Sequence, residues 1–219
     1  MTAGDIQTEP LPTNSHAIAR WSGLAGVAGP ILFVLLFTLA GALSPGYSPL
    51  RQPISDLGAV GPARWIQNIN FVLSGLLLLA FVFGFFWQMR PVIPKTWLRL
   101  STLCLVLTGA GLTIVGFFPT DIPGFPPSSL HGLVHDILFF VIFGALLIAL
   151  FVIGWRLRQN PAWRRDGWYA TITGLGMIAL FVVLVIMTQR QLGGLFQRIF
   201  EIEAFAWYVV MGWRLFTIG

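Results

Sequence analysis

The sequence has few charged residues. Asp, Glu, Lys and Arg make up 10% of its 219 residues, and hydrophobic residues make up 56%, whereas a soluble domain has about 25% charged residues. A chain with so little charge cannot cover a globule in water, which excludes a soluble globular domain and indicates a lipid bilayer. The formal net charge of +5 comes from basic residues in short connections, where membrane topology places them, so it does not indicate nucleic-acid binding.

Cysteine and cofactor motifs are also scarce. Cys104 is the only cysteine, which excludes an intrachain disulfide and a cysteine metal cluster. Its position inside an apolar run predicts a small buried side chain. The sequence has no phosphate-binding glycine loop and no haem or flavin motif. A few polar residues are therefore the only indication of a function.

Six apolar segments are long enough to cross a bilayer, which takes about 20 helical residues. They predict an all-α polytopic membrane protein, a bundle of six transmembrane helices over residues 21–219 that follows a polar cytoplasmic tail over residues 1–20. The first segment is longer than a secretory signal core and follows a single basic residue, Arg20, so we expect a retained helix. The predicted spans are residues 21–43, 69–87, 98–118, 130–155, 168–187 and 195–216.

The basic residues predict the orientation of the bundle. Nine lie in the N-terminal tail, the second and fourth connections and the C-terminal end, against four in the first, third and fifth connections. Positive residues stay in the cytoplasm, so we expect both termini to be cytoplasmic, in a prokaryotic plasma (inner) membrane. The first, third and fifth connections then face outward.

Five glycines lie within the predicted spans: Gly75, Gly109, Gly111, Gly116 and Gly144. Small residues let helix backbones approach closely in a membrane. We expect these glycines to mark helix–helix contacts. The phenylalanines and leucines of the spans are expected to face lipid or core and indicate no function.

The first outward connection is rich in proline. Its four prolines predict a stiff, irregular backbone. Such a loop can hold the side chains of Tyr47, Arg51 and Gln52 in fixed positions for binding. Ser55 and Asp56 are candidate catalytic residues that could handle a water molecule. The alternative is that Ser55 or Asp56 caps a short interfacial helix and that Arg51 pairs with a lipid phosphate.

Two histidines follow the third connection. His131 and His135 lie at i and i+4 and therefore share one helix face. With Asp121 they provide the ligand count of an open zinc site, in which water takes the fourth position and becomes activated to attack a carbonyl. No Glu lies between the histidines, so the metalloprotease helix motif is absent. The alternative is that both histidines hydrogen-bond to loop backbone.

The sixth span carries ionisable groups. A helix that began after Glu203 would be too short to cross, so the span must begin before these residues, which places Glu201 about 9 Å into it. His135 lies at a similar depth in its own helix. Gln197, Arg198 and Glu201 are therefore predicted binding residues. Arg198 and Glu201 at i and i+3 can form an ion pair, which would lower the cost of burying either group.

The run PGYSPLRQPISDLG over residues 45–58 resembles the signature of the bacterial and archaeal membrane family called domain of unknown function 998. The segments 116–121, 131–135 and 194–198 resemble other marks of that family, and the similarity covers nearly the whole chain. The resemblance implies a six-helix integral membrane protein. It implies no activity, because the family is defined by an unknown function.

A looser similarity concerns membrane hydrolases. A Ser, an Asp and a His-x-x-x-His are similar to the pattern of the family that includes alkaline ceramidases and adiponectin receptors, which use a zinc-bound water against a lipid amide. The chain departs from this pattern, because it has six predicted spans where those proteins have seven. Its histidine pair also lies on the fourth span and not on the last.

Three functions are compatible with the sequence. The first is binding of a lipid head group, an envelope molecule or a protein partner at the outward polar site, which the stiff loop favours. The second is a zinc-dependent hydrolase of a lipid amide or ester, with one zinc ion on Asp121, His131 and His135 and with Ser55 or Asp56 handling water. The third is a small transporter, for which a broken helix pair and midplane charges are missing. We expect a membrane lipid as partner and no nucleic acid.

Overall fold

The computed structural model describes residues 13–122 and 129–218, and within these ranges the chain forms helices and loops without a strand. Two short elements, α2 (Asp56–Ala59) and a 3₁₀ turn (Pro161–Trp163), accompany six long helices. Those are α1 (Thr13–Ala42), α3 (Arg64–Met89), α4 (Lys95–Val115), α5 (Leu130–Leu157), α6 (Arg164–Thr188) and α7 (Gly193–Ile218). Most of the predicted N-terminal tail lies outside the described residues.

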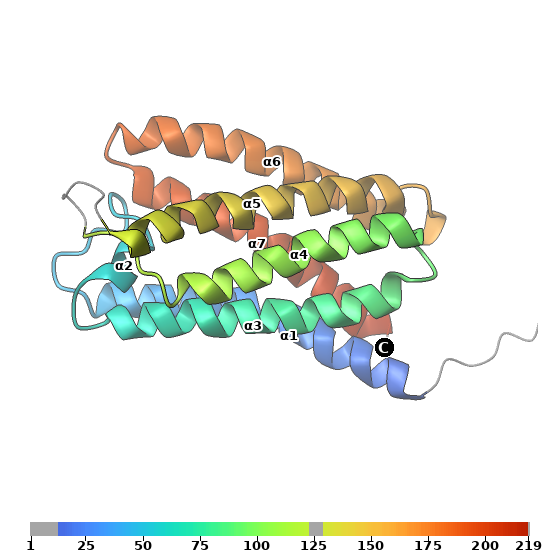
Figure 1. Ribbon diagram of the computed structural model, residues 1–219. Coiled ribbons are helices and arrows are strands. Elements are labelled where there is room, and N and C mark those ends of the chain that lie inside the picture. The colour runs from blue at the N-terminus through green and yellow to red at the C-terminus, as the bar shows by residue number, and fades with distance from the viewer. Residues whose placement is uncertain (1–12, 123–128, 219) are drawn as a thin grey trace, which may run out of the picture.

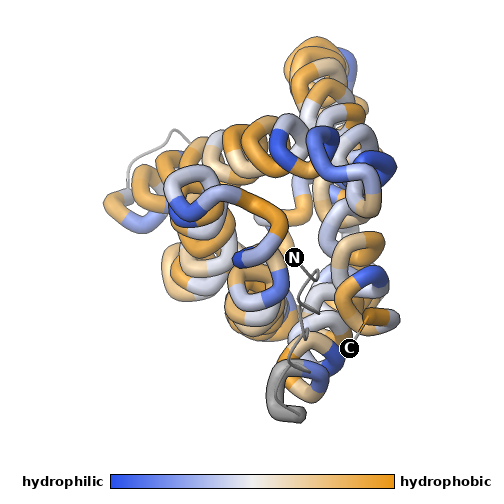
Figure 2. The backbone as a smooth tube through the Cα atoms, turned by 90° about the vertical axis from the view of Figure 1, so that its right-hand side faces the viewer, coloured by the Kyte–Doolittle hydropathy of each residue, from blue (hydrophilic) through white to orange (hydrophobic). Residues whose placement is uncertain are grey.

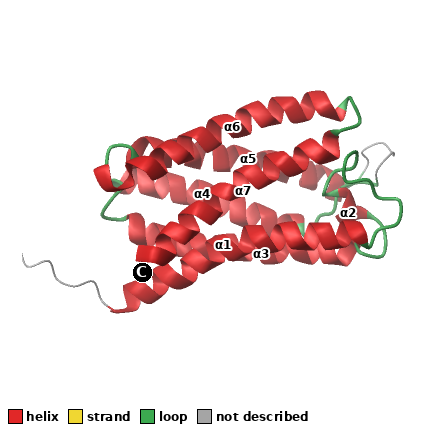
Figure 3. Ribbon diagram, turned by 180° about the vertical axis from the view of Figure 1, so that it is seen from behind, coloured by secondary structure: helices red, strands yellow, loops and turns green. Residues whose placement is uncertain are grey.

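The six long helices form a closed ring. Each packs against the next in the order α1, α3, α4, α5, α6 and α7, and α7 packs against α1. The ends of α1, α4 and α6 lie beside α2 at one end of the ring, together with the starts of α3, α5 and α7 (Figure 1). We call this the α2 end. The helix α7 ends, and α1 begins, at the opposite end (Figure 3).

The helices are built to cross a membrane. Five of them, α1, α3, α4, α5 and α6, are long and apolar enough to do so. The sixth, α7, has 26 residues, about 39 Å of helix, and lies between α1 and α6 in the same ring. Figure 2 looks at the end opposite α2 and shows hydrophilic residues mainly at the helix ends and in the connections. The chain is a multi-pass membrane protein, and its six long helices correspond to the predicted spans.

Aromatic side chains fill the interior of the ring. Phe33 on α1 meets Phe205 on α7 edge-on, with ring centroids 5.1 Å apart, and Phe81 on α3 meets Tyr208 in the same way at 5.4 Å. Gly75 brings α3 close to α4, because a Cβ there would lie 2.6 Å from the carbonyl oxygen of the facing helix. Packed aromatic rings and a close backbone contact fix the relative positions of α1, α3, α4 and α7.

Candidate functional site

The start of α7 holds the loop between α1 and α3 by backbone contacts. The N–H groups of Gly194 and Leu195 donate to the carbonyls of Arg51 and Leu50 at 3.2 and 3.0 Å. A Cβ on Gly194 would lie 2.7 Å from the Pro49 carbonyl oxygen. A glycine is required here, because any side chain would push the loop away from the helix.

Arg198 anchors the same loop through its side chain. Its Nη1 donates to the carbonyls of Pro49 at 2.9 Å and Gln52 at 3.1 Å, and its Nη2 donates to the Tyr47 hydroxyl. The Tyr47 hydroxyl in turn donates to the Pro53 carbonyl at 2.9 Å. The guanidinium charge is therefore met by backbone dipoles and a phenol, and the proline-rich loop is closed around it.

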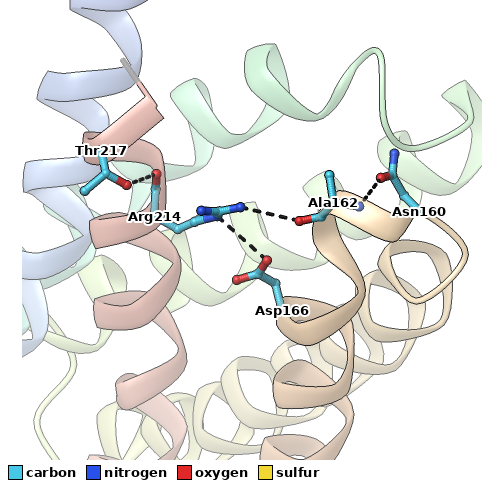
Figure 4. Close-up of polar contacts among 5 residues, drawn as sticks. All are labelled: Asn160, Ala162, Asp166, Arg214 and Thr217. Atoms are coloured by element: carbon cyan, nitrogen blue, oxygen red, sulfur yellow. Dashed lines mark hydrogen bonds and ion pairs between the residues drawn. The ribbon is translucent and has the colours of Figure 1, made fainter.

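The predicted ion pair between Arg198 and Glu201 is wrong. An ion pair forms instead between Arg214 and Asp166, at 3.8 Å near the end opposite α2 (Figure 4). The folded loop gives the Arg198 guanidinium several acceptors that the sequence spacing does not reveal. As a result, Glu201 Oε2 is buried without a hydrogen-bond partner.

A polar cavity lies inside the ring near the α2 end. Its polar lining consists of Ser55, His135, Gln197 and Glu201, and phenylalanines from α1, α3, α5 and α7 form much of the rest. Its volume of about 30 Å³ suits a group of about the size of one water molecule. His135 and Glu201 are only 8% and 6% exposed. Two helices that are not consecutive in the ring thus bring ionisable groups to one small space.

The hydrogen bonds define what this polar cavity can offer a ligand. His135 Nδ1 lies 2.9 Å from the Phe118 carbonyl oxygen, and a carbonyl only accepts, so Nδ1 donates and the neutral ring keeps Nε2 as an acceptor. Gln197 Oε1 accepts from the Ile54 N–H at 2.7 Å. Glu201 adds carboxylate oxygens. The acceptors His135 Nε2 and Glu201 suit a group that donates hydrogen bonds.

The three predicted zinc ligands have different surroundings. Among the residues that the structure describes, no three His, Cys, Asp or Glu side chains form a group that could hold a metal ion. His131 is exposed and lies against Phe118 at 5.4 Å between ring centroids. The Asp121 carboxylate covers the first turn of α5, where a Cβ on Gly132 would overlap it. The role of Asp121, His131 and His135 as zinc ligands therefore stays a prediction.

Comparison with known proteins identifies a family to which the sequence is similar. The family described as "Protein of unknown function (DUF998)" matches residues 27–214, which include the whole polar cavity. The chain belongs to the DUF998 family. Neither the curated proteins nor the solved structures gave a match. The predicted resemblance to this membrane family is confirmed, and the looser similarity to zinc-dependent membrane hydrolases stays a prediction.

Ser55 and Asp56 of this DUF998 protein lie at the start of α2, and Ser55 also lines the polar cavity. Ser55 occupies the N-cap position but its side chain makes no capping hydrogen bond, so the predicted capping role is wrong for Ser55. Burial raises the pKa of the Asp56 carboxyl to about 6, against the opposing charge of Arg198. Burial also raises the pKa of the Tyr47 phenol, although the hydrogen bond from Arg198 opposes it.

The remaining predicted residues of the DUF998 protein have simpler positions. Arg51 is exposed at the surface of the loop. Gln52 is half-buried, and its Oε1 accepts from the Ser48 N–H at 2.7 Å. Tyr47 and Gln52 belong to the loop that Arg198 of α7 anchors, and the predicted binding roles of all three stay predictions.

Sequence reasoning missed a buried polar row on α3. Asn70 Nδ2 donates to the Phe33 carbonyl at 3.0 Å and to Gln67 Oε1 at 3.4 Å, and Ser74 donates to Asn70 Oδ1 at 3.2 Å. The spacing of residues 67, 70 and 74 places them on one helix face, which is a signal that the sequence contains. The Phe118 carbonyl that orients His135 has no such signal, because any residue type supplies a carbonyl.

Proposed function

We propose that the protein binds, in the polar cavity, a small group that donates hydrogen bonds, above all the protonated amine of a membrane amphiphile or envelope molecule. The main support is the position of Glu201, which is only 6% exposed and whose Oε2 is buried without a hydrogen-bond partner. A buried carboxylate is costly unless a cation or several donors meet it. The cation nearest in sequence, Arg198, is already engaged with the loop.

The lining of the polar cavity favours an ammonium group over an anion. His135 Nε2 offers a second acceptor close to Glu201, and the faces of phenylalanine rings attract cations. A phosphate offers mainly acceptor oxygens, which the acceptors of this lining do not suit, and it would exceed the small volume of about 30 Å³. The size and charge of the cavity thus support an amine or hydroxyl terminus and not a whole phospholipid head group.

Binding is favoured over catalysis. A Ser55 nucleophile would need a base such as His135 within about 2.6–3.2 Å, and the contacts of the described residues include no hydrogen bond between these side chains. The distribution of basic residues would place the α2 end outside a plasma membrane. We therefore propose that the ligand comes from the outer leaflet or the cell envelope.

The test uses the purified protein in mild detergent with methylammonium as the probe. A ligand that binds only the folded state raises the melting temperature, by about 2–5 °C at about tenfold its Kd for a chain of this size. We expect this rise with methylammonium and not with tetramethylammonium at equal ionic strength, because the latter has no N–H groups. A Glu201→Gln variant should lose the response.

Glu203→Gln is the matched control. Glu203 lies two residues along α7, and its side chain reaches Gly176 on α6, where a Cβ would lie 2.5 Å from its Oε1. This variant removes a carboxylate from the same helix but leaves the polar cavity intact, so it should respond like the unchanged protein. Equal responses to both cations, or an unchanged response in Glu201→Gln, would contradict the proposed function.

A further inference from the structure

An apolar groove opens between α5 and α6 and reaches α7. Residues 139–147 of α5, residues 177–182 of α6 and Phe200 contribute to its lining, which is apolar throughout, and its volume is about 220 Å³. This exceeds the roughly 150 Å³ cavity that can hold a benzene ring. Phe140 and Val182 on its walls are 64% and 53% exposed, so the groove faces outward from the ring. We call it the lateral groove.

The lateral groove adjoins the polar cavity. Phe139 and Phe143 line both spaces, and their ring centroids lie 4.9 Å apart. Phe143 also lies 4.7 Å from the ring of Phe200 on α7. The two spaces therefore meet at these phenylalanine rings, and Glu201 lines the inner one.

Gly144 leaves the middle of the lateral groove open. A Cβ at this position would meet no atom within 4 Å. The expectation that this glycine marks a close helix–helix contact is therefore wrong, in contrast to Gly75. The absence of a side chain at Gly144 instead deepens the groove, which makes its substitution a direct way to fill the space.

Along α5 a polar residue is followed by apolar ones, in the same order as the polar head and the hydrocarbon chain of a lipid. His135 precedes Phe139, Phe143 and Leu147 on a helix that runs away from the α2 end. At about 1.5 Å per residue the groove extends about 12 Å beyond the depth of Phe139. A polar group at the cavity would thus lie near the membrane surface, and an attached chain would run toward the bilayer midplane.

We infer that the lateral groove holds the hydrocarbon chain of a single-chain amphiphilic amine whose ammonium group occupies the polar cavity. This inference rests on the proposed function. The volume of the groove selects one chain and not two, and Glu201 selects an amine over a fatty acid. A second apolar groove, between α1 and α7, has a volume of about 370 Å³ and shares only Phe205 with the polar cavity. It serves as an internal control.

The experiment uses dodecylamine with a diazirine in mid-chain as the photoreactive probe and the matching carboxylic acid as its control. The protein is reconstituted in phospholipid nanodiscs, illuminated and digested, and the labelled peptides are quantified by mass spectrometry. We expect the amine to label residues 139–147 and 177–182 at least about tenfold more than the acid does. Glu201→Gln should remove this preference.

Two substitutions locate the chain. Gly144→Phe fills the lateral groove and should lower its labelling by about tenfold, while Leu35→Phe, in the groove between α1 and α7, should leave it unchanged. Ile178→Trp fills the lateral groove from α6. It is the alternative variant if Gly144→Phe does not fold. Both groove variants should keep the melting-temperature rise with methylammonium, because the polar cavity is intact.

The outcomes separate the two proposals. A methylammonium response with no amine preference in the lateral groove would overturn this inference and leave the proposed function standing. Strongest labelling between α1 and α7 would also overturn it. Loss of a dimer in Gly144→Phe, seen by native mass spectrometry, would show that a second copy of the chain covers the groove and would overturn it as well.

Discussion

The charged side chains at the two ends of α7 have different partners. Near its last turn Arg214 pairs with Asp166 on α6 at 3.8 Å and donates to the Ala162 carbonyl at 3.4 Å (Figure 4). Near its first turns Arg198 donates to loop carbonyls and to a phenol, and Glu201 Oε2 has no hydrogen-bond partner. One acid is compensated within the fold, and the other lies beside a cavity.

This difference indicates which acid serves the fold and which serves a ligand. A carboxylate that is already paired with a cation of the protein needs no cation from a ligand. We therefore interpret the pair of Asp166 with Arg214 as a contact that holds α6 against α7. Glu201 would cost free energy in the empty protein, and a ligand that brings a cation would recover that cost. The following predictions test this comparison from the largest expected effect to the smallest.

Breaking the loop anchor should have the largest effect. Arg198→Ala removes the donors for the Pro49 and Gln52 carbonyls and for the Tyr47 hydroxyl. Losing a half-buried charged group that makes several hydrogen bonds costs about 1.5–3 kcal/mol. The free energy of unfolding, measured by denaturant titration in mixed micelles, should fall by this amount. Arg51→Ala, an exposed arginine in the same loop, should change it by less than about 0.5 kcal/mol; equal losses would show that Arg198 is no anchor.

Gly194 and Gly144 should respond to alanine with opposite signs. A Cβ on Gly194 would lie 2.7 Å from the Pro49 carbonyl oxygen, whereas one on Gly144 meets nothing within 4 Å. Forcing a methyl into a filled contact costs about 1–3 kcal/mol, while Gly→Ala in an unobstructed helix gains up to about 1 kcal/mol. The same titration measures both. If Gly144→Ala lowered the free energy of unfolding as much as Gly194→Ala, the contact between Gly194 and the loop would not be the cause of the loss.

Hydrophobicity was sufficient to predict the helices but not their ends. The six spans follow from apolar runs long enough for a bilayer. The structure begins α1 at Thr13 and not at Trp21, and α3 at Arg64 and not at Ile69. Polar turns at the membrane surface remain helical through backbone hydrogen bonds, which hydropathy does not detect.

For the candidate site, the sequence predicts how deep each residue lies along its helix but not which way its side chain points. Counting residues places His135 and Glu201 in one layer, and both line the polar cavity. The spacing of His131 and His135 does not reveal that one is exposed and the other buried, because this depends on how α5 is rotated in the ring. The engagement of Arg198 with the loop, and not with Glu201, depends on carbonyl positions that only the folded loop defines.

Asp56, at the start of α2, should make the free energy of unfolding depend on pH. Its pKa rises from 3.8 to about 6 through burial, so the folded state holds a proton that the unfolded state releases between these values. This contribution is fully present below about pH 4 and is lost as pH rises through about 6. The full shift corresponds to about 3 kcal/mol, reduced to about 1 kcal/mol by the partial exposure of the side chain.

The control for this pH effect is a second aspartate. Unfolding titrations at several pH values should show the decline in the unchanged protein and a flatter curve in Asp56→Asn. Asp136→Asn, which removes an exposed carboxylate from α5, should keep the decline. A decline that survives in Asp56→Asn would assign the titration to another group.

The smallest effects test the comparison of the two acids most directly. Asp166→Asn breaks the pair with Arg214, whose side chain is 43% exposed, and should lower the free energy of unfolding by about 0.5–1 kcal/mol. Glu201→Gln removes a buried carboxyl group whose Oε2 has no hydrogen-bond partner, and it should raise the free energy of unfolding by up to about 1 kcal/mol. Both are measured without amine in the same detergent. Opposite signs would mean that Glu201, unlike Asp166, is maintained against stability, as a ligand site requires, whereas a loss in both variants would mean that Glu201 also serves the fold.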